Sequence, residues 1–581
     1  MKTFFGRVIA VVFGIALFLI LCLIFFSVIG AALGGEEKVK VSSGSVLTID
    51  LNDPVIESNM EVETSIFNLG KEDSPQLLHM LKAIENAGKD DKIKGISIEL
   101  DTSEEFDISQ IELLRNEIEK FKSSGKFVYA YTNRALQSDY YLASVADSIF
   151  HNPLGMIEIK GLSSEIMFFK NLGEKYGVEF EIIRHGDYKS AVEPFMRENL
   201  SEENREQLTQ IITQIWNEMS SKMAASRSIP QQQFNQFTDS LISFNAENAL
   251  KNKLIDVLIQ QSDYHDFLKS KLGSEKSKKL KSINLTEYSK TVENKFNSDK
   301  IAVLYANGMI MPGESQYGIQ SETYKEAIQQ IAKDDKIKAI VLRINSGGGD
   351  ANTSEEILHE ISKINSDIPI IASFGEVAAS GGYYIATHAD YIFAEPYTIT
   401  GSIGVLGMIP NFKGLANNIG ITTDFVQTNA NTVYYSPFQG LTADGKKVIT
   451  ESTESIYSIF VNHVANNRKK SYAEIDALGG GRVYTGMEAK RNGLVDELGS
   501  LQDAIKYAAE KAGIENYQLK SFPQKKNDLE TLLKEMNLTA EVKNEIRSSM
   551  DPEILKMYMR VEQLKSLNGV QVLWPYEMKI K

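Results

Sequence analysis

The sequence contains an internal duplication, and this feature limits the possible folds more than any other. Residues 90–96 (DDKIKGI) recur as residues 334–340 (DDKIKAI), 244 positions later. Four further pairs of segments match at offsets of 240 to 243: Tyr140–Tyr141 with Tyr383–Tyr384, Ala146–Phe150 with Ala389–Phe393, Pro194–Phe195 with Pro437–Phe438, and Leu254–Asp256 with Leu494–Asp496. Similarity spread over about 160 residues with few gaps indicates a duplicated domain rather than a shared short motif.

Each copy alternates strand-like and helix-like patterns. In the second copy, the apolar runs Ile301–Tyr305 and Ala339–Ile344 are typical of buried strands, and Tyr324–Ala332 between them has helical spacing. A helix over Ser354–Ile364, with Ser354 as its N-cap, a strand over Ile368–Ser373 and a helix over Gly381–His388 are expected to follow. This alternation predicts an α/β fold with a largely parallel sheet in each copy, and sites beyond the carboxyl ends of the strands.

The repeats set the expected domain boundaries. We expect an N-terminal repeat over 42–270, a polar, lysine-rich linker over 271–299 and a C-terminal repeat over 300–525. The tail, 526–581, has no counterpart in the first copy. Its pattern predicts two helices, Asp528–Met536 and Pro552–Ser566, followed by the apolar segment Val570–Tyr576. The tail suggests no function by itself.

The N-terminus has the pattern of a membrane anchor. Val8–Leu33 is a run of 26 residues without a charge, long enough to span a bilayer, so a transmembrane helix is predicted over 8–34. Lys2 and Arg7 precede the run and acidic residues follow it, which predicts that residues 1–7 are cytoplasmic and the remainder extracytoplasmic. Small residues near its end leave signal-peptide cleavage open as an alternative.

Composition excludes several classes of function. A net charge of −15 argues against nucleic acid as a partner, because phosphate binding needs clustered Lys and Arg. The only cysteine, Cys22, lies in the apolar N-terminal run, so neither an internal disulfide nor a catalytic thiol outside that run is expected. Seven scattered histidines lack ligand spacing, so the sequence predicts no metal and no other cofactor.

The two copies differ at chemically important positions. At an offset of 243, Ser380 stands opposite Gln137, and Gly381 and Gly382 stand opposite Ser138 and Asp139, so the first copy lacks both the hydroxyl and the glycines. At the same offset Lys189 of the first copy stands opposite Thr432. Because each copy retains a different reactive residue, we expect one composite site formed by both repeats.

The pair predicts a Ser–Lys dyad. A serine hydroxyl needs a base, and a lysine can serve only if burial lowers its pKa from about 10.4 towards neutrality. Apolar neighbours such as Val192 and Phe195 would desolvate Lys189, and Ser402 is the candidate second hydroxyl that orients the amine. The backbone N–H groups of the Asn345–Gly349 turn and of Gly381 are candidate oxyanion donors.

Three alternatives stay open at this point. The first is crotonase-like acyl-CoA or thioester chemistry, which needs an oxyanion site but no Ser/Lys pair. The second is a non-catalytic scaffold. The third is a Ser–His–Asp triad, for which His388 and His185 are the candidate histidines.

Several segments resemble the signal peptide peptidase A (protease IV) family, in its long, duplicated, membrane-anchored form. The motifs that carry the resemblance are Arg343–Gly349, Ala378–Tyr384, Thr400–Gly404, Tyr188–Ala191 and Glu193–Phe195. The resemblance implies ClpP/crotonase-like repeats, Ser380 as the nucleophile, Lys189 as the base and Ser402 as the hydroxyl bound to the lysine. Gly347 replaces the proline usual in the family, so the oxyanion donor, Gly348 or Gly349, stays open.

The resemblance also implies a biological setting. Members of the family digest remnant signal peptides after their release from pre-proteins. The expected partners are therefore short apolar peptides and the membrane, and the expected assembly is a bowl-like homotetramer. The expected location is the bacterial inner membrane, crossed once, with the catalytic region on the periplasmic side.

Overall fold

The computed structural model describes residues 39–51, 55–58, 76–100, 107–292, 297–313, 318–524 and 570–573. The chain divides into two compact units, Met1–Ser42 and Ser43–Lys581, and the fold below is that of the second unit. The anchor predicted over 8–34 and both predicted tail helices lie outside the described residues. Within the described ranges, no helix combines the length and apolar character needed to cross a membrane.

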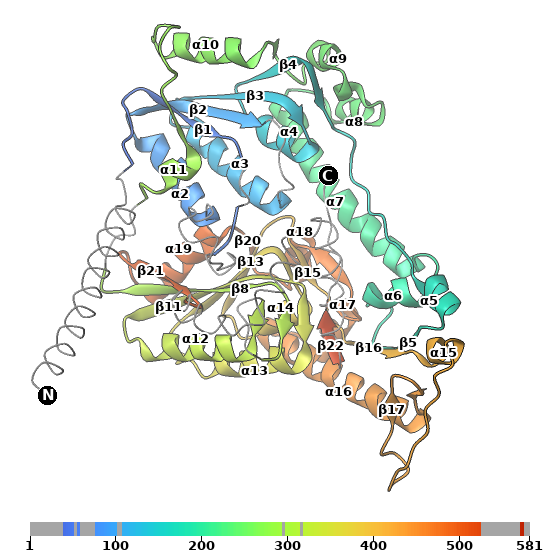
Figure 1. The fold of residues 1–581 in the computed structure, drawn as a ribbon. Coiled ribbons are helices and arrows are strands. Elements are labelled where there is room, and N and C mark those ends of the chain that lie inside the picture. Colours follow the sequence, from blue (N-terminus) through green and yellow to red (C-terminus); the bar gives the residue numbers. More distant parts are fainter. Residues whose placement is uncertain are drawn as a thin grey trace, which may run out of the picture. The chain divides into compact units, whose positions relative to one another are not determined.

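A parallel sheet of six strands forms the core of the first repeat (Figure 1). Its strand order is β6-β4-β3-β2-β1-β7, and every pair of neighbours is parallel. The strands are β1 (Ser45–Ile49), β2 (Ile93–Leu100), β3 (Phe127–Ala135), β4 (Ser148–Ile157), β6 (Val257–Leu258) and β7 (Ser282–Asn284). The helices α2 (Leu77–Lys89), α3 (Ile108–Lys122) and α4 (Gln137–Ala143) connect successive strands, as expected for an α/β unit.

The second repeat has the same strand order. Its strands run β21-β8-β11-β13-β14-β20 where the first repeat has β7-β1-β2-β3-β4-β6, and all these pairs are parallel. These strands are β8 (Lys300–Asn307), β11 (Ile337–Ser346), β13 (Ile370–Ala379), β14 (Tyr391–Ala394), β20 (Glu497–Leu498) and β21 (Gln518–Phe522). Residues Val377–Ala379 of β13 also pair with β15 (Ile399–Gly401). Strand β15 pairs in turn with β19 (Val483–Thr485), which is antiparallel to it. The shared order confirms the duplication.

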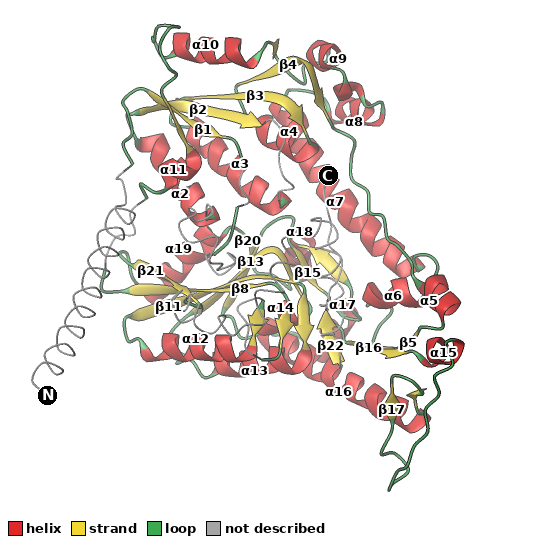
Figure 2. Cartoon of the chain, in the orientation of Figure 1, coloured by secondary structure: helices red, strands yellow, loops and turns green. Residues whose placement is uncertain are grey.

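Both faces of the second sheet are buried. Alternate residues of β8 enter two different hydrophobic clusters, Ala302 and Leu304 on one face and Ile301 and Val303 on the other. The first cluster includes the apolar sides of α12 (Ser321–Lys333) and α13 (Ala351–Ser362), which lie along one face of the sheet in Figure 2. The second cluster includes α19 (Leu501–Ala512).

Three local expectations about the second repeat were wrong at their boundaries. Strand β13 continues to Ala379, because the small residues after Ser373 pair with β15 instead of turning. The following helix, α14, covers only Gly381–Ile385. Helix α13 begins at Ala351 rather than after Ser354, because the Asp350 side chain accepts a hydrogen bond from Thr353 N (2.8 Å) and acts as its N-cap.

A third sheet joins the two repeats. Strand β5 (Glu179–Arg184) of the first repeat pairs antiparallel with β16 (Leu406–Asn411) of the second. Lys189 follows β5 by five residues, and the long helix α7 (Glu202–Ser226) begins soon afterwards. This sheet therefore brings a segment of the first repeat to the strand ends of the second.

Candidate active site

Ser380 lies at the junction between β13 and α14, in a strained backbone conformation. Its φ of 57° and ψ of −117° are rarely adopted by residues with a side chain. Two backbone contacts hold this turn: Ser380 N donates to Gly401 O (2.9 Å), and Tyr384 N donates to Ser380 O (2.8 Å). The turn presents a buried hydroxyl at the carboxyl end of a central strand, where parallel α/β sheets place their sites.

Lys189 of the first repeat meets two serines of the second. Its Nζ lies 2.7 Å from Ser380 Oγ, 2.9 Å from Ser402 Oγ and 3.1 Å from Ser402 O. All three residues are buried, with 1% of the lysine exposed and neither serine accessible. The sequence comparison therefore selected residues that the fold brings into direct contact, although 191 positions separate Lys189 from Ser380.

Burial lowers the pKa of Lys189 well below its usual value. Glycine backbones contribute to this burial, because a Cβ built on Gly481 would lie 2.5 Å from Lys189 Cβ, and one on Gly404 would lie 3.3 Å from Lys189 Cδ. Of the predicted apolar neighbours, Val192 is buried against β16, in a cluster with Leu406. A lysine in this environment is neutral over a wider pH range than a surface lysine.

The other predicted neighbour, Phe195, packs against two further aromatic rings. Its ring stacks on Phe169 at a centroid distance of 5.9 Å and packs at a tilt against Phe180 at 5.0 Å. These rings come from the segment before α5 (Lys170–Tyr176) and from β5. Phe195 therefore contributes to the packing of the segment that carries Lys189.

Arg482 connects Ser402 to the segment that carries Lys189, and the sequence analysis did not identify this residue. Its carbonyl oxygen accepts a hydrogen bond from Ser402 N (2.7 Å), which holds the Ser402 turn at a φ of 49°. Its guanidinium lies over the ring of Tyr188, 4.7 Å from the centroid, and donates to Glu206 Oε1 (2.8 Å) on α7. The three consecutive glycines before it, 479–481, were the one sequence signal that a close approach of backbones occurs here.

Three glycines adjoin Ser380. A Cβ on Gly381 would lie 3.1 Å from Gly348 Cα and 3.2 Å from Gly349 N, so the Asn345–Gly349 turn lies directly against the residue after Ser380. Gly348 and Gly349 have φ values of 98° and 156°, which favour glycine. Gly348 N donates to Ser346 Oγ (3.1 Å) within the turn.

The corresponding positions of the first repeat have lost this arrangement. Gln137 occupies the place of Ser380, and its Oε1 accepts hydrogen bonds from Lys160 N (3.1 Å) and Gly161 N (2.9 Å). Thr432, opposite Lys189, is exposed on the second repeat. Among the described residues, the Ser380–Lys189 contact therefore has no equivalent at Gln137 and Thr432.

The histidine alternative has no geometric support. His388 is exposed, whereas Ser380 is buried. His185 Nδ1 lies 2.7 Å from Glu454 Oε2, and its ring stacks on Tyr457 with centroids 3.6 Å apart. Among the described residues, no three His, Cys, Asp or Glu side chains are arranged to hold a metal ion.

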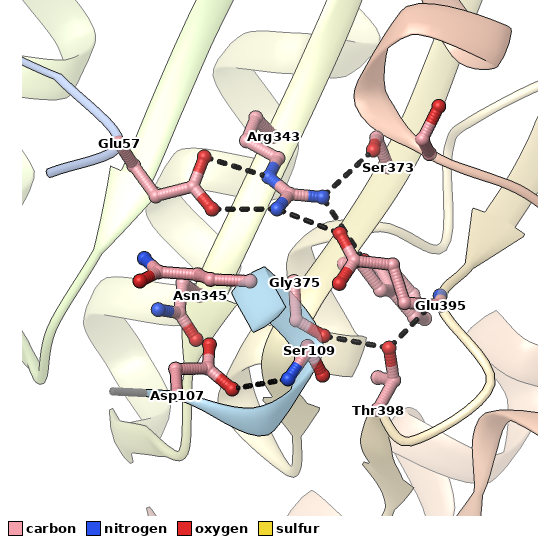
Figure 3. Close-up of polar contacts among 12 residues, drawn as sticks. Glu57, Asp107, Ser109, Arg343, Asn345, Ser373, Gly375, Glu395 and Thr398 are labelled. Carbon is pink, nitrogen blue, oxygen red and sulfur yellow. Dashed lines mark hydrogen bonds and ion pairs between the residues drawn. The ribbon is translucent and has the colours of Figure 1, made fainter. Parts of the chain in front are cut away.

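A buried ion network lies under the strand ends that carry the site (Figure 3). Arg343 on β11 contacts Glu57 of the first repeat twice, at 3.1 Å from Nε to Oε2 and 2.6 Å from Nη2 to Oε1. The same Nη2 lies 2.8 Å from Glu395 Oε1, and Nη1 donates to Ser373 Oγ on β13 (3.1 Å). One guanidinium therefore ties the first repeat to the strands that lead to Gly348, Ser380 and Ser402.

Carboxyl groups outnumber the cation in this network. Burial raises the pKa of Glu395 from 4.5 to about 7, against the opposing effect of Arg343. Burial, followed by the negative charge of Glu376, raises the pKa of Asp107 well above its usual value. Figure 3 shows Asp107 and Glu395 on opposite sides of Gly375. The network is therefore sensitive to protonation.

Comparison with known proteins agrees with the duplicated architecture. The sequence pattern of peptidase family S49 matches the chain twice, at residues 120–273 and 362–515. Protease 4 of Salmonella typhi is 34% identical over 506 residues, which cover 85% of this chain and 80% of that protein. Protease 4 of Haemophilus influenzae is 32% identical over 512 residues, covering 84% of this chain and 83% of that protein.

A solved structure of a ClpP1 mutant from Listeria monocytogenes aligns with 35% of this chain and 94% of its own, at 16% identity and a TM-score of 0.23. The assignment of the fold therefore depends on the strand order and the sequence matches. Together they define a tandemly duplicated α/β serine peptidase. The chain belongs to peptidase family S49.

Proposed function

We propose that this chain is a membrane-anchored serine endopeptidase in which Ser380 is the nucleophile and Lys189 the general base. The observation that carries the proposal is the 2.7 Å separation of Lys189 Nζ and Ser380 Oγ in a buried, desolvated site. That separation is within hydrogen-bonding reach for proton transfer. Because the lysine belongs to the first repeat and the serine to the second, activity requires the repeats to be docked.

The proposed reaction has two halves. In the first, neutral Lys189 removes the proton from Ser380 Oγ as that oxygen attacks the peptide carbonyl carbon, and the ammonium then protonates the leaving amine. In the second, Lys189 removes a proton from water, the hydroxide attacks the acyl ester, and the proton returns to Ser380 Oγ. Ser402 Oγ, 2.9 Å from Nζ, orients the amine throughout.

Backbone amides stabilise the negative charge that develops on the substrate oxygen. The amides of Gly348, Gly349 and Gly381 are the proposed donors, since these residues lie directly against one another beside Ser380. The Gly348 N–H donates to Ser346 Oγ (3.1 Å), so it would exchange this acceptor for the substrate oxygen. Donors of this kind contribute on the order of 10²–10³ in kcat each. The tightness of this turn leaves no room for side chains, which supports the role of the glycines.

The proposed substrates are remnant signal peptides and other short apolar peptides. The basis is the family resemblance and the predicted anchor over 8–34, which would hold a periplasmic catalytic region beside the bacterial inner membrane where such peptides are released. Each repeat is proposed to have a ClpP/crotonase-like fold, supported by the shared strand order.

The proposed assembly is a homotetramer, and the pseudo-symmetry of the chain supports a head-to-tail contact. The segment of the first repeat around Phe195 packs onto the second repeat through β5 and β16. The equivalent segment of the second repeat exposes large apolar side chains, which include Ile419, Val426 and Phe438. A second subunit is the proposed partner for this segment, because exposed apolar side chains gathered on one segment commonly mark an interface.

The decisive experiment compares purified variants for hydrolysis of a fluorogenic apolar peptide. Ser380→Ala and Lys189→Ala should each abolish turnover while circular dichroism and melting temperature stay close to those of the wild type. Lys413→Ala, an exposed lysine on the second repeat, is the matched control and should retain full activity. Normal turnover by either dyad variant would disprove the dyad. A parallel thioester assay tests the acyl-CoA alternative, and absence of all hydrolysis by the wild type would favour the scaffold.

A further inference from the structure

The last described strand of the chain lies in the middle of the third sheet. This strand, β22 (Val570–Leu573), is antiparallel to β12 (Gly348–Asp350) on one side and to β16 on the other. The partners across β12 are Leu573 with Gly348, Val572 with Gly349 and Gln571 with Asp350, and those across β16 are Gln571 with Leu406 and Val570 with Gly407. Figure 1 shows β22 beside β16, far in sequence from both of its neighbours.

Both neighbours of β22 belong to the proposed catalytic centre. β12 contains Gly348 and Gly349, and β16 begins four residues after Ser402. The outer edge of β12 already pairs with β9 (Ile310–Met311), and the outer edge of β16 already pairs with β5. The two inner edges therefore face a slot one strand wide, since adjacent strands lie about 4.8 Å apart.

We infer that residues 570–573 are a built-in pseudosubstrate that occupies the peptide-binding slot of this enzyme. The inference rests on the proposed function. An extended peptide can gain backbone hydrogen bonds only from unpaired strand edges, and among the described strands next to the proposed site these edges are the ones β22 uses.

The register of β22 has the direction that a substrate needs. The strand runs from Val570 to Leu573 towards Gly348, so its carboxyl end approaches the turn that adjoins Gly381 and the nucleophile. A substrate bound in the same direction would place a peptide bond at the oxyanion turn. The apolar sequence around the strand, Val570–Tyr576, also matches the class of peptide proposed as substrate.

Competition by a tethered segment weakens the binding of external peptides without changing the chemistry. The apparent Kd equals the intrinsic Kd divided by the fraction of molecules whose slot is open, so a tail bound about 90% of the time raises it about tenfold. The tail thereby confines hydrolysis to conditions in which apolar peptides are abundant. This role belongs to a C-terminal segment that has no counterpart in the first repeat.

The test measures peptide binding in a chain that cannot turn over substrate. In full-length Ser380→Ala protein, Val570→Pro combined with Val572→Pro removes two backbone donors from β22. Fluorescence anisotropy with a labelled Gly-Val-Gln-Val-Leu peptide should then report binding about tenfold tighter than in Ser380→Ala alone. Glu577→Pro combined with Lys579→Pro, outside β22, is the matched control and should leave the affinity unchanged.

In the active protein, Val570→Pro combined with Val572→Pro should raise kcat/KM about tenfold by lowering KM, with kcat unchanged. Equal peptide affinity with and without the β22 prolines would overturn the inference, and so would a loss of binding in a variant that melts at the wild-type temperature. The binding experiment does not depend on the dyad. Hydrolysis by Ser380→Ala or Lys189→Ala would therefore refute the proposed chemistry, and the binding experiment would still test the role of β22.

Discussion

Replacing Glu395 by glutamine should make the stability of the protein less dependent on pH. Glu395 is 1% exposed and shares the guanidinium of Arg343 with Glu57. Burial raises its pKa from 4.5 to about 7. Below pH 4.5 this carboxyl is neutral in both the folded and the unfolded chain, but as the pH rises through 7 the fold must accommodate a buried charge. The stability that the neutral Glu395 carboxyl gives to the folded chain is therefore lost as the pH rises from 4.5 to about 7.

The size of this effect follows from the shift. At about 1.4 kcal/mol per pKa unit, a rise from 4.5 to about 7 corresponds to roughly 3 kcal/mol at alkaline pH. Glutamine has the same shape without the charge. The free energy of unfolding of Glu395→Gln, relative to that of the wild type, should therefore increase by up to roughly 3 kcal/mol between about pH 5 and about pH 8, which means that the variant is relatively more stable at the higher pH.

Urea unfolding of full-length protein at both pH values measures this difference. Glu510→Gln removes an exposed carboxyl from α19 and is the matched control, for which the difference from the wild type should be the same at both pH values. An equal difference in the free energy of unfolding between Glu395→Gln and the wild type at both pH values would contradict the raised pKa of Glu395.

Three further predictions concern the packing of the site. Gly481→Ala should reduce kcat in the peptide assay at least a hundredfold, because the new Cβ would lie 2.5 Å from Lys189 Cβ. Gly513→Ala is the control, since Gly513 also has a positive φ but has open space around it, and this variant should retain activity. Arg343→Met should lower the free energy of unfolding by about 3–5 kcal/mol, measured in urea, since it leaves buried carboxylates without their cation. Lys189→Met should raise the melting temperature, and the gain should increase as the pH falls. The reason is that the lowered pKa of the folded lysine makes the unfolded chain bind the extra proton.

The candidate Ser–Lys pair could be found from the sequence because the duplication supplied an internal comparison. Ser380 and Lys189 differ from their counterparts Gln137 and Thr432, and the fold brings the first pair together. The alternation of apolar strands and amphipathic helices was enough to predict the parallel sheets, because local periodicity reports which faces an element buries. Ser402 was a candidate because it lies between glycines in the segment Gly401–Gly404, and its hydroxyl lies 2.9 Å from Lys189 Nζ.

Contacts between distant segments could not be predicted in this way. Glu57 contacts Arg343 across 286 residues, and the Arg482 guanidinium reaches Gln210 across 272, through the docking of one repeat on the other. Strand β22 is short, and its pairing depends on the unpaired edges of β12 and β16 rather than on its own sequence. The extension of β13 to Ala379 likewise depends on β15, because a run of small residues has little strand preference until a partner strand pairs with it.

The most direct test of the Ser–Lys dyad is covalent labelling of the nucleophile as a function of pH. Full-length protein treated with a fluorophosphonate and mapped by mass spectrometry should carry the label on Ser380. The labelling rate should rise through one ionisation that lies well below the usual pKa of a lysine, because only the neutral amine can activate the hydroxyl. Lys189→Met should not be labelled. A label on another residue, or labelling of Lys189→Met at the wild-type rate, would contradict the dyad.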